Sequence, residues 1–317
     1  MYKFDAGKVQ IGISGCLLGQ GVRFDGGHKR SDFCTGELAR LVDFVPVCPE
    51  MAIGLGSPRP SIRLVQRDAD ILAITSRGRD VSEPLRDYGR QQAGQLGHLS
   101  GYILCAKSPS CGMERVRVYH ASGGGSEKSG VGVYAAELMR GQPLLPVEED
   151  GRLNDPLIRE NFITRVYAYH DWQSLVRQGI TPASLIAFHS RYKYLLLAHH
   201  RSGYQQLGQL LADLSAEPEQ KAEHYIAGLM AALAHRANRN NHTNVLQHLQ
   251  GYFKRQLNSR QRQELAHTIH QYQDGLLPLL APITLLRHYL AEHPNEYLQR
   301  QVYLNPHPET LRLRYGI

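Results

Sequence analysis

The sequence predicts an α/β protein with a Rossmann-like parallel sheet in its N-terminal domain, followed by an all-α C-terminal domain. In the first half, short apolar runs alternate with helix-compatible stretches, as expected for strands of a parallel sheet joined by helices. From Pro156 onward the apolar residues recur at helical spacing. With 317 residues, 42% of them hydrophobic, the chain is long enough to form two domains with buried cores.

Four apolar segments are expected to form strands in the N-terminal domain: residues 9–14, 42–47, 71–74 and 101–106. Helix-compatible segments between them are residues 35–42 and 84–97. A connection rich in proline and acidic residues, 141–156, separates the halves, so we expect domains at 1–150 and 151–317. The expected helices of the second domain are 156–177, 182–200, 219–237, 242–257, 259–273 and 283–304.

The positive charge of the chain lies mainly in its second half. The formal net charge is +7, and residues 1–155 hold 19 Lys and Arg against 18 Asp and Glu. The rest of the chain holds 17 against 11, together with 12 of the 17 tyrosines. Basic side chains interleaved with aromatic ones suit phosphate contacts and base stacking, so the second half is a candidate nucleic-acid-binding domain. The alternative is a helical domain with solvated basic faces.

Six basic residues of the second half are candidate phosphate contacts: Arg191, Lys193, Arg236, Arg239, Lys254 and Arg255. Arg236 and Arg239 are three residues apart, so we expect them to share one face of a helix. Tyr192, Tyr194 and Tyr252 are candidates for stacking on bases, although tyrosine at helical spacing is often half-buried core.

Five cysteines, an odd number in a chain of this length, favour free thiols in a reducing, cytoplasmic setting. Cys16, Cys48 and Cys111 each occur at, or just past, the end of an expected strand. Because the carboxyl ends of parallel strands line one crevice, these thiols can meet there and hold a metal or an iron–sulfur cluster. The alternative is that they are small core residues. We interpret Cys34 and Cys105 as structural, since Cys105 lies inside an apolar strand.

The residues around these thiols resemble the thiouracil desulfidase (TudS) family. Four motifs occur in the family's order: Gly15-Cys16-Leu17-Leu18-Gly19, Val47-Cys48-Pro49-Glu50, Lys107-Ser108-Pro109-Ser110-Cys111-Gly112 and Gly130-Val131-Gly132-Val133. The second half resembles the YbgA-like helical domain often fused behind it, through residues 159–166, 188–194 and 303–308. This arrangement is similar to that of the tRNA 4-thiouridine desulfidases (RudS-type).

The resemblance implies a [4Fe-4S] cluster held by Cys16, Cys48 and Cys111, with one iron that lacks a protein ligand. Such an iron is a Lewis acid for the soft sulfur of a thiocarbonyl, whose ring carbon water can then attack while sulfide leaves. The resemblance also marks Glu50 and Ser108 as catalytic. Glu50 would activate the water, or else stabilise the first turn of a helix; Ser108 would relay a proton, or else shape a turn.

The leading expectation is a desulfidase that converts 4-thiouridine in tRNA into uridine, with the second domain holding the tRNA. The first alternative keeps the chemistry but acts on free thiouracil or thiouridine compounds. The second is a non-enzymatic iron–sulfur sensor or interaction protein. We infer no obligate protein partner. We also expect no membrane span, because no stretch approaches the roughly 18 apolar residues that one requires.

Overall fold

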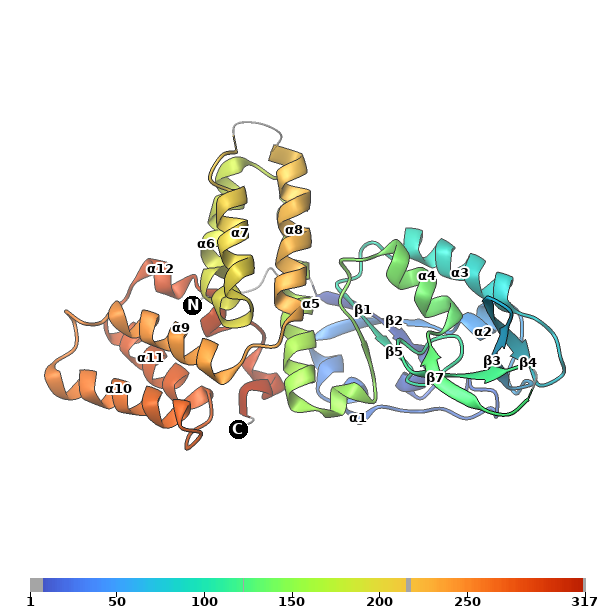
Figure 1. Ribbon diagram of the computed structural model, residues 1–317. Helices are drawn as coiled ribbons and strands as arrows, with labels where there is room; N and C mark the ends of the chain where they lie inside the picture. Colours follow the sequence, from blue (N-terminus) through green and yellow to red (C-terminus); the bar gives the residue numbers. More distant parts are fainter. Residues whose placement is uncertain (1–7, 122, 215–217, 316–317) are drawn as a thin grey trace. The chain divides into compact units, whose positions relative to one another are not determined.

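The computed structural model describes residues 8–121, 123–214 and 218–315 (Figure 1). The chain divides into two compact units between Asp155 and Pro156. The first unit is α/β and the second is helical, as the sequence predicts. The first seven residues and the last two, which the expected domains include, lie outside the described residues. None of the described helices combines the length and the apolar composition that a membrane span requires.

Sheet A, the main sheet of the first unit, is parallel throughout. Its strands are β1 (Val9–Ser14), β2 (Val42–Val47), β5 (Gly101–Leu104) and β8 (Val147–Glu149), in the order β2-β1-β5-β8. Strand β1 is central and pairs with β2 and β5 on either side, with Ile11 opposite both Phe44 and Gly101. The side chains of β1 and β5 are almost all buried, which explains their continuous apolar sequences.

A second sheet, sheet B, contains β3 (Ile62–Arg67), β4 (Asp70–Thr75), β6 (Val116–His120) and β7 (Ser126–Gly130), in the order β4-β3-β6-β7. The segment 71–74 is a strand, as predicted, but its expected place in the parallel sheet is wrong. It is part of β4, which pairs antiparallel with β3. A hairpin requires only a short turn, and Asp68 provides it with a positive φ of 51°.

The helices of the first unit that cover more than one turn are α3 (Ser82–Gln95) and α4 (Val133–Gly141). They pack closely because Gly89 has no side chain: a Cβ there would lie 2.7 Å from the Cβ of Glu137. The rings of Tyr88 and Tyr134 stack beside this contact, 5.7 Å apart. The expected helix at 35–42 is wrong, since α1 (Asp32–Thr35) ends before Gly36 and only a 3-10 turn (Leu38–Arg40) follows.

The second unit is built from helices (Figure 1). They are α5 (Pro156–Gln178), α6 (Pro182–His199), α7 (Arg201–Leu210), α8 (Pro218–Ala234), α9 (Arg239–Gly251), α10 (Ser259–Gln273), α11 (Leu280–Glu292) and α12 (Glu296–Gln299). Thr181 caps the start of α6, because its side chain accepts from the Ser184 N–H. The single helix expected over 283–304 is wrong: α11 ends at Glu292, and Asn295 caps a separate α12. Sequence reasoning did not identify α7.

A buried ion pair ties the C-terminal segment of the chain to α5. The Arg314 guanidinium donates to the Glu160 carboxylate, with Nε 3.1 Å from Oε1, and to the Tyr303 carbonyl at 2.7 Å. Burial alone would raise the pKa of Glu160. The His307 imidazole, whose Nε2 lies 3.9 Å from Oε1, and the charge of Arg314 outweigh it and lower that pKa to about 2. The carboxylate therefore stabilises the folded helical unit.

Replacing Glu160 with alanine should destabilise the helical unit by about 3 kcal/mol, because Arg314 would stay buried without its partner. The wild-type contribution should be complete above pH 4.5 and decline as the pH falls toward 2, since folding lowers this pKa from 4.5. Urea unfolding at several pH values measures both effects. Glu223→Ala, at an exposed position of α8, is the control; an equal loss in both variants would contradict the assignment.

Candidate active site

Four cysteines line one pocket of about 400 Å³ at the carboxyl edge of sheet A. Cys16 lies two residues past β1, Cys48 directly follows β2, Cys105 directly follows β5, and Cys111 lies in the loop beyond it. The structure thus brings together the three thiols expected to meet. The placement of Cys105 inside a strand is wrong, because β5 ends at Leu104. Cys34 is buried in α1 and does not line this pocket.

The pairing of β1 with β5 places Cys105 beside Cys16. The Cys105 N–H donates to Oγ of Ser14, the last residue of β1, at 3.0 Å. Because parallel strands end at the same edge, the residues that follow β1 and β5 enter the pocket together. Cys105 is therefore part of the pocket. The sequence did not reveal this, because it did not show that the strand ends one residue before Cys105.

The thiols are close enough to perturb one another. A hydrogen bond with Cys105, burial, and the charges of Cys105, Cys111 and Cys48 together raise the pKa of Cys16. Burial raises the pKa of Cys111 most, and Glu50, Cys105 and Cys48 add to the shift. Grouped buried thiols of this kind lose their protons readily only when a cation compensates the thiolate charge.

A cation lies at the rim of the same pocket. The Lys29 ammonium pairs with Asp150, with Nζ 2.9 Å from Oδ2. Asp150 also accepts from the Ala106 N–H at 2.8 Å, next to Cys105. Lys29 lines the pocket. Its charge contributes to lowering the pKa of Cys105, behind the larger effect of the hydrogen bond with Cys16.

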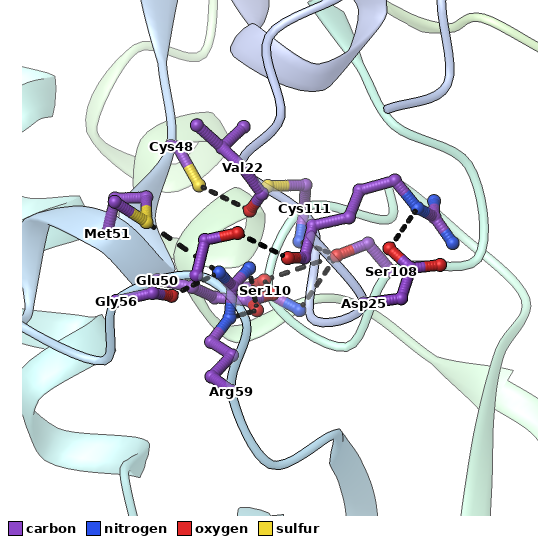
Figure 2. A network of polar contacts seen from close by, with 12 residues as sticks. Val22, Asp25, Cys48, Glu50, Met51, Gly56, Arg59, Ser108, Ser110 and Cys111 are labelled. Carbon is purple, nitrogen blue, oxygen red and sulfur yellow. Dashed lines mark hydrogen bonds and ion pairs between the residues drawn. The ribbon is translucent and has the colours of Figure 1, made fainter. Parts of the chain in front are cut away.

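Glu50 lines the pocket in the first turn of α2 (Pro49–Ala52), and its carboxylate binds two other side chains (Figure 2). Oε2 accepts from Arg59, at 2.7 Å from Nε and 2.6 Å from Nη2. Oε1 accepts from the Ser110 hydroxyl. These bonds hold the carboxylate at the pocket wall, and its place in the first turn of α2 is also the one that a role in stabilising the helix expects.

The sequence left Ser108 between a role in relaying a proton and a role in shaping a turn. Its hydrogen bonds are compatible with both roles. Its Oγ accepts from the backbone N–H groups of Ser110 and Cys111, at 3.3 and 3.1 Å, so it shapes the turn that presents Cys111. The same Oγ lies 3.1 Å from the Ser110 hydroxyl. A chain of hydrogen-bonding groups therefore runs from Ser108, which lines the pocket, through Ser110 to Glu50.

Two further residues of this network, Arg59 and Ser110, belong to the site, although they were not predicted as site residues from the sequence. Arg59 forms a salt bridge with Glu50. Its side chain is only 3% exposed. Ser110 is fully buried, and its position two residues after Ser108 in the same motif was the available signal.

The thiols of the pocket are donors of the type that an iron–sulfur cluster takes. Among the residues that the structure describes, no group of three or more His, Cys, Asp or Glu is arranged to hold one metal ion. A cubane cluster needs only one thiolate for each ligated iron, and soft sulfur donors are the ligands that it takes. Cys16, Cys48 and Cys111, gathered in one mostly buried pocket, fit that group.

The candidate phosphate contacts of α6 are partly used within the unit. Arg191 pairs with Asp171 at 3.1 Å, and its guanidinium lies over the Phe188 ring. Lys193 lies over the ring of Tyr194. Tyr192 and Tyr194 are buried, so stacking of RNA bases on them is wrong. Residues two positions apart point about 200° apart on a helix. α6 is therefore covered on two sides, with Tyr192 stacked on Phe188 and Tyr194 hydrogen-bonded to Tyr252.

The other basic candidates lie around α9. Arg236 is in the connection before α9, so the expected shared helix face with Arg239 is wrong. Both nevertheless line one pocket of about 610 Å³, where the Arg239 guanidinium lies over the Tyr272 ring. Lys254 and Arg255 are exposed in the turns that follow α9.

Known families match both units. Residues 11–150 match the 2-thiouracil desulfurase family, and residues 193–308 match a family described as a protein of unknown function (DUF1722). The chain is 37% identical over 159 residues to the uncharacterized protein YbgA of Escherichia coli (strain K12). The matched segment covers 50% of this chain and 94% of that protein. A solved structure, the [4Fe-4S]-dependent thiouracil desulfidase TudS, is 30% identical and covers 47% of this chain and 95% of its own, with a TM-score of 0.38.

The fold and the matched segments define a desulfurase domain, of the class that cleaves carbon–sulfur bonds, joined to a helical domain. The chain belongs to the family of YbgA-like proteins, and its YbgA-like domain is fused to a 2-thiouracil desulfurase domain.

Replacing Gly132 with alanine should displace the loop that carries Ser110 and Cys111. The added Cβ would lie 2.6 Å from the Ser110 carbonyl and 2.7 Å from the Cys111 nitrogen, both backbone atoms. We expect a loss of about 1–3 kcal/mol in the free energy of unfolding and faster labelling of Cys111 by a thiol reagent. Gly94→Ala, which has open space in α3, is the control. Unchanged stability and labelling in Gly132→Ala would refute this packing argument.

Proposed function

We propose that the protein is a [4Fe-4S]-dependent desulfidase that converts 4-thiouridine in tRNA into uridine and releases sulfide. The observation that carries the proposal is the gathering of Cys16, Cys48 and Cys111 beside Glu50 in one pocket of the desulfurase domain. The three thiolates would hold the cluster, and its iron without a protein ligand would supply a Lewis acid for the thiocarbonyl sulfur.

The residues of the pocket perform the proton transfers. Water adds to the ring carbon, the carbon–sulfur bond breaks, and the two protons of the water leave with the sulfur as hydrogen sulfide. Glu50 accepts the first of these protons, because its carboxylate lines the pocket and needs only a water within hydrogen-bond distance. No electron donor enters this balance, since the overall reaction is a hydrolysis.

Arg59 and the two serines control where that proton goes. Arg59 places two N–H donors on Oε2 of Glu50, which leaves Oε1 as the oxygen that exchanges protons. Oε1 is hydrogen-bonded to Ser110, and Ser110 to Ser108 at the pocket wall. A proton taken up by Glu50 can return to the departing sulfur through these hydroxyl groups.

The helical unit would hold the tRNA while the thiolated base leaves its stack. Unstacking a base costs a few kcal/mol, and contacts to the RNA backbone offset that cost. Among the basic candidates, Arg236, Lys254 and Arg255 are exposed, and the exposed Tyr252 stacks on Tyr297 at 5.8 Å. We place the reaction in the reducing cytoplasm, where an iron with an open position and free thiols persist.

Free thiouracil or thiouridine compounds are the second candidate substrates, because the name of the matched family and that of the TudS relative both refer to thiouracil. The pocket residues would act on either substrate in the same way. A sensor or interaction protein, the remaining alternative, needs no base beside its ligands and releases no sulfide.

The decisive experiment is anaerobic reconstitution with iron and sulfide, followed by addition of thiolated tRNA. We expect the 4-thiouridine absorbance to disappear as sulfide appears. Cys16→Ala, Cys48→Ala and Cys111→Ala should each lose the brown colour and the activity, whereas Cys34→Ala should keep both. Sulfide from free 4-thiouridine alone would favour the second candidate, and no sulfide from either substrate would favour the sensor.

Glu50→Gln should keep the cluster absorbance but reduce kcat by about 10²–10⁴-fold, because the amide cannot accept the proton. Ser110→Ala should cause a smaller loss, since water can replace part of the relay. Cluster content and single-turnover rates, measured together, separate lost catalysis from lost cofactor. Glu37→Gln, exposed on the same unit, is the matched control. A Glu50→Gln rate near that of the control would falsify the assignment of the base.

A further inference from the structure

A groove rich in basic residues adjoins the cysteine pocket within the first unit. It has a volume of about 700 Å³ and shares part of its wall with that pocket, through Ile62, Ala106, Lys107 and Pro109. From there it runs along sheet B, whose strands β3, β6 and β7 provide half of the remaining lining residues. The reacting base and whatever occupies the groove would therefore lie next to each other.

The groove has more positive charge than its own carboxylates neutralise. Of its six basic side chains, Arg152 pairs with Glu114 and Glu148, and Arg115 lies 3.6 Å from Glu114. Its other carboxylate, Glu149, accepts from the Met113 N–H. The other four basic residues make no ion pair with any residue that the structure describes; they are Arg63, Lys107, Arg117 and Lys128.

Three of these cations form a row across neighbouring strands. Arg117 of β6 lies directly opposite Lys128 of β7. Leu64 of β3 pairs with Val118 of β6, so Arg63 lies beside Arg117. Leu64 and Val118 are buried while the arginines are exposed, which places the row on the open face of sheet B. Like charges opposite each other destabilise a sheet, so this row indicates a polyanionic ligand.

The ends of the groove suit an RNA strand. Lys107 lies in the wall common to both cavities and has a left-handed backbone, φ 65°, which is unusual for lysine and occurs where the surroundings demand it. On β6, the Tyr119 ring lies under the Arg63 guanidinium, 5.7 Å from its centroid. Planar groups of this kind stack on bases, and cations between them contact phosphates.

We propose that this groove binds the sugar–phosphate backbone of the RNA beside the reacting nucleotide. The inference rests on the proposed desulfidase function and deepens it, because a free thiobase carries no phosphate and would leave the row of cations without a ligand. The catalytic unit thereby selects a nucleotide within a chain, in addition to any contacts that the helical unit makes.

The test compares binding of unmodified tRNA by the whole protein at several salt concentrations, measured by fluorescence anisotropy. Arg117→Gln combined with Lys128→Gln should weaken binding at least tenfold and reduce the slope of log Kd against log salt by about two, one for each lost phosphate contact. Arg40→Gln combined with Arg77→Gln is the matched control, because both arginines are exposed on the same unit and neither lines the groove. It should bind like wild type.

Kinetics and stability complete the test. In the groove variant, the ratio of kcat/KM for thiolated tRNA to kcat/KM for the free nucleoside should fall at least tenfold, with the unfolding temperature within two degrees or so of wild type. Equal tRNA affinity and salt slope in the groove variant and wild type would overturn the groove while leaving the desulfidase intact. Wild-type protein that releases sulfide only from the free nucleoside would overturn the tRNA substrate itself. Displacement of bound tRNA by poly-glutamate at equal charge would assign the groove to acidic polypeptides instead.

Discussion

The parallel pairing of β1 with both β2 and β5 is the constraint on which the site depends. It brings segments separated by dozens of residues to one edge, so that Cys16, Cys48 and Cys105 follow neighbouring strands. Cys111 joins them because Ser108 and the close approach of Gly132 hold its loop. Without this pairing the thiols would be isolated core residues, and Glu50 would have no pocket to face.

The polar network behind the thiols is rigid for a physical reason. Arg59 is buried and also donates to the Gly56 carbonyl at 2.7 Å, so its guanidinium has a fixed orientation. That orientation fixes Glu50, and Glu50 in turn fixes Ser110. A carboxylate held by several donors stays in one place while protons come and go, which is the preorganisation that proton transfer requires.

Regular, strongly patterned elements could be predicted from the sequence, and locally interrupted ones could not. Strands β1 and β2 were found because they are apolar and bounded by turn residues, and α5 because it is long. In sheet B, the segment 71–74 of β4 was predicted as a strand, but β3 and β7 escaped because they carry charged residues on their open face. The average charge of the first half, near zero, concealed the row formed by Arg63, Arg117 and Lys128, since the compensating acids lie elsewhere in that half. An average over a domain cannot show which like charges a sheet places side by side.

Asp150 lies close to the division of the chain into two units, so the position of a truncation affects the cysteine pocket. This residue closes the wall of the cysteine pocket through Lys29 and the Ala106 N–H, although it lies only five residues before the division of the chain. A proteolytic fragment or truncated gene that stops short of it would remove the partner of Lys29 and of the Ala106 N–H at the rim of the pocket. One that continues through Asp155 also retains Arg152 and its two acidic partners. The position of the cut therefore decides whether the isolated domain keeps the contacts that its pocket has in the full chain.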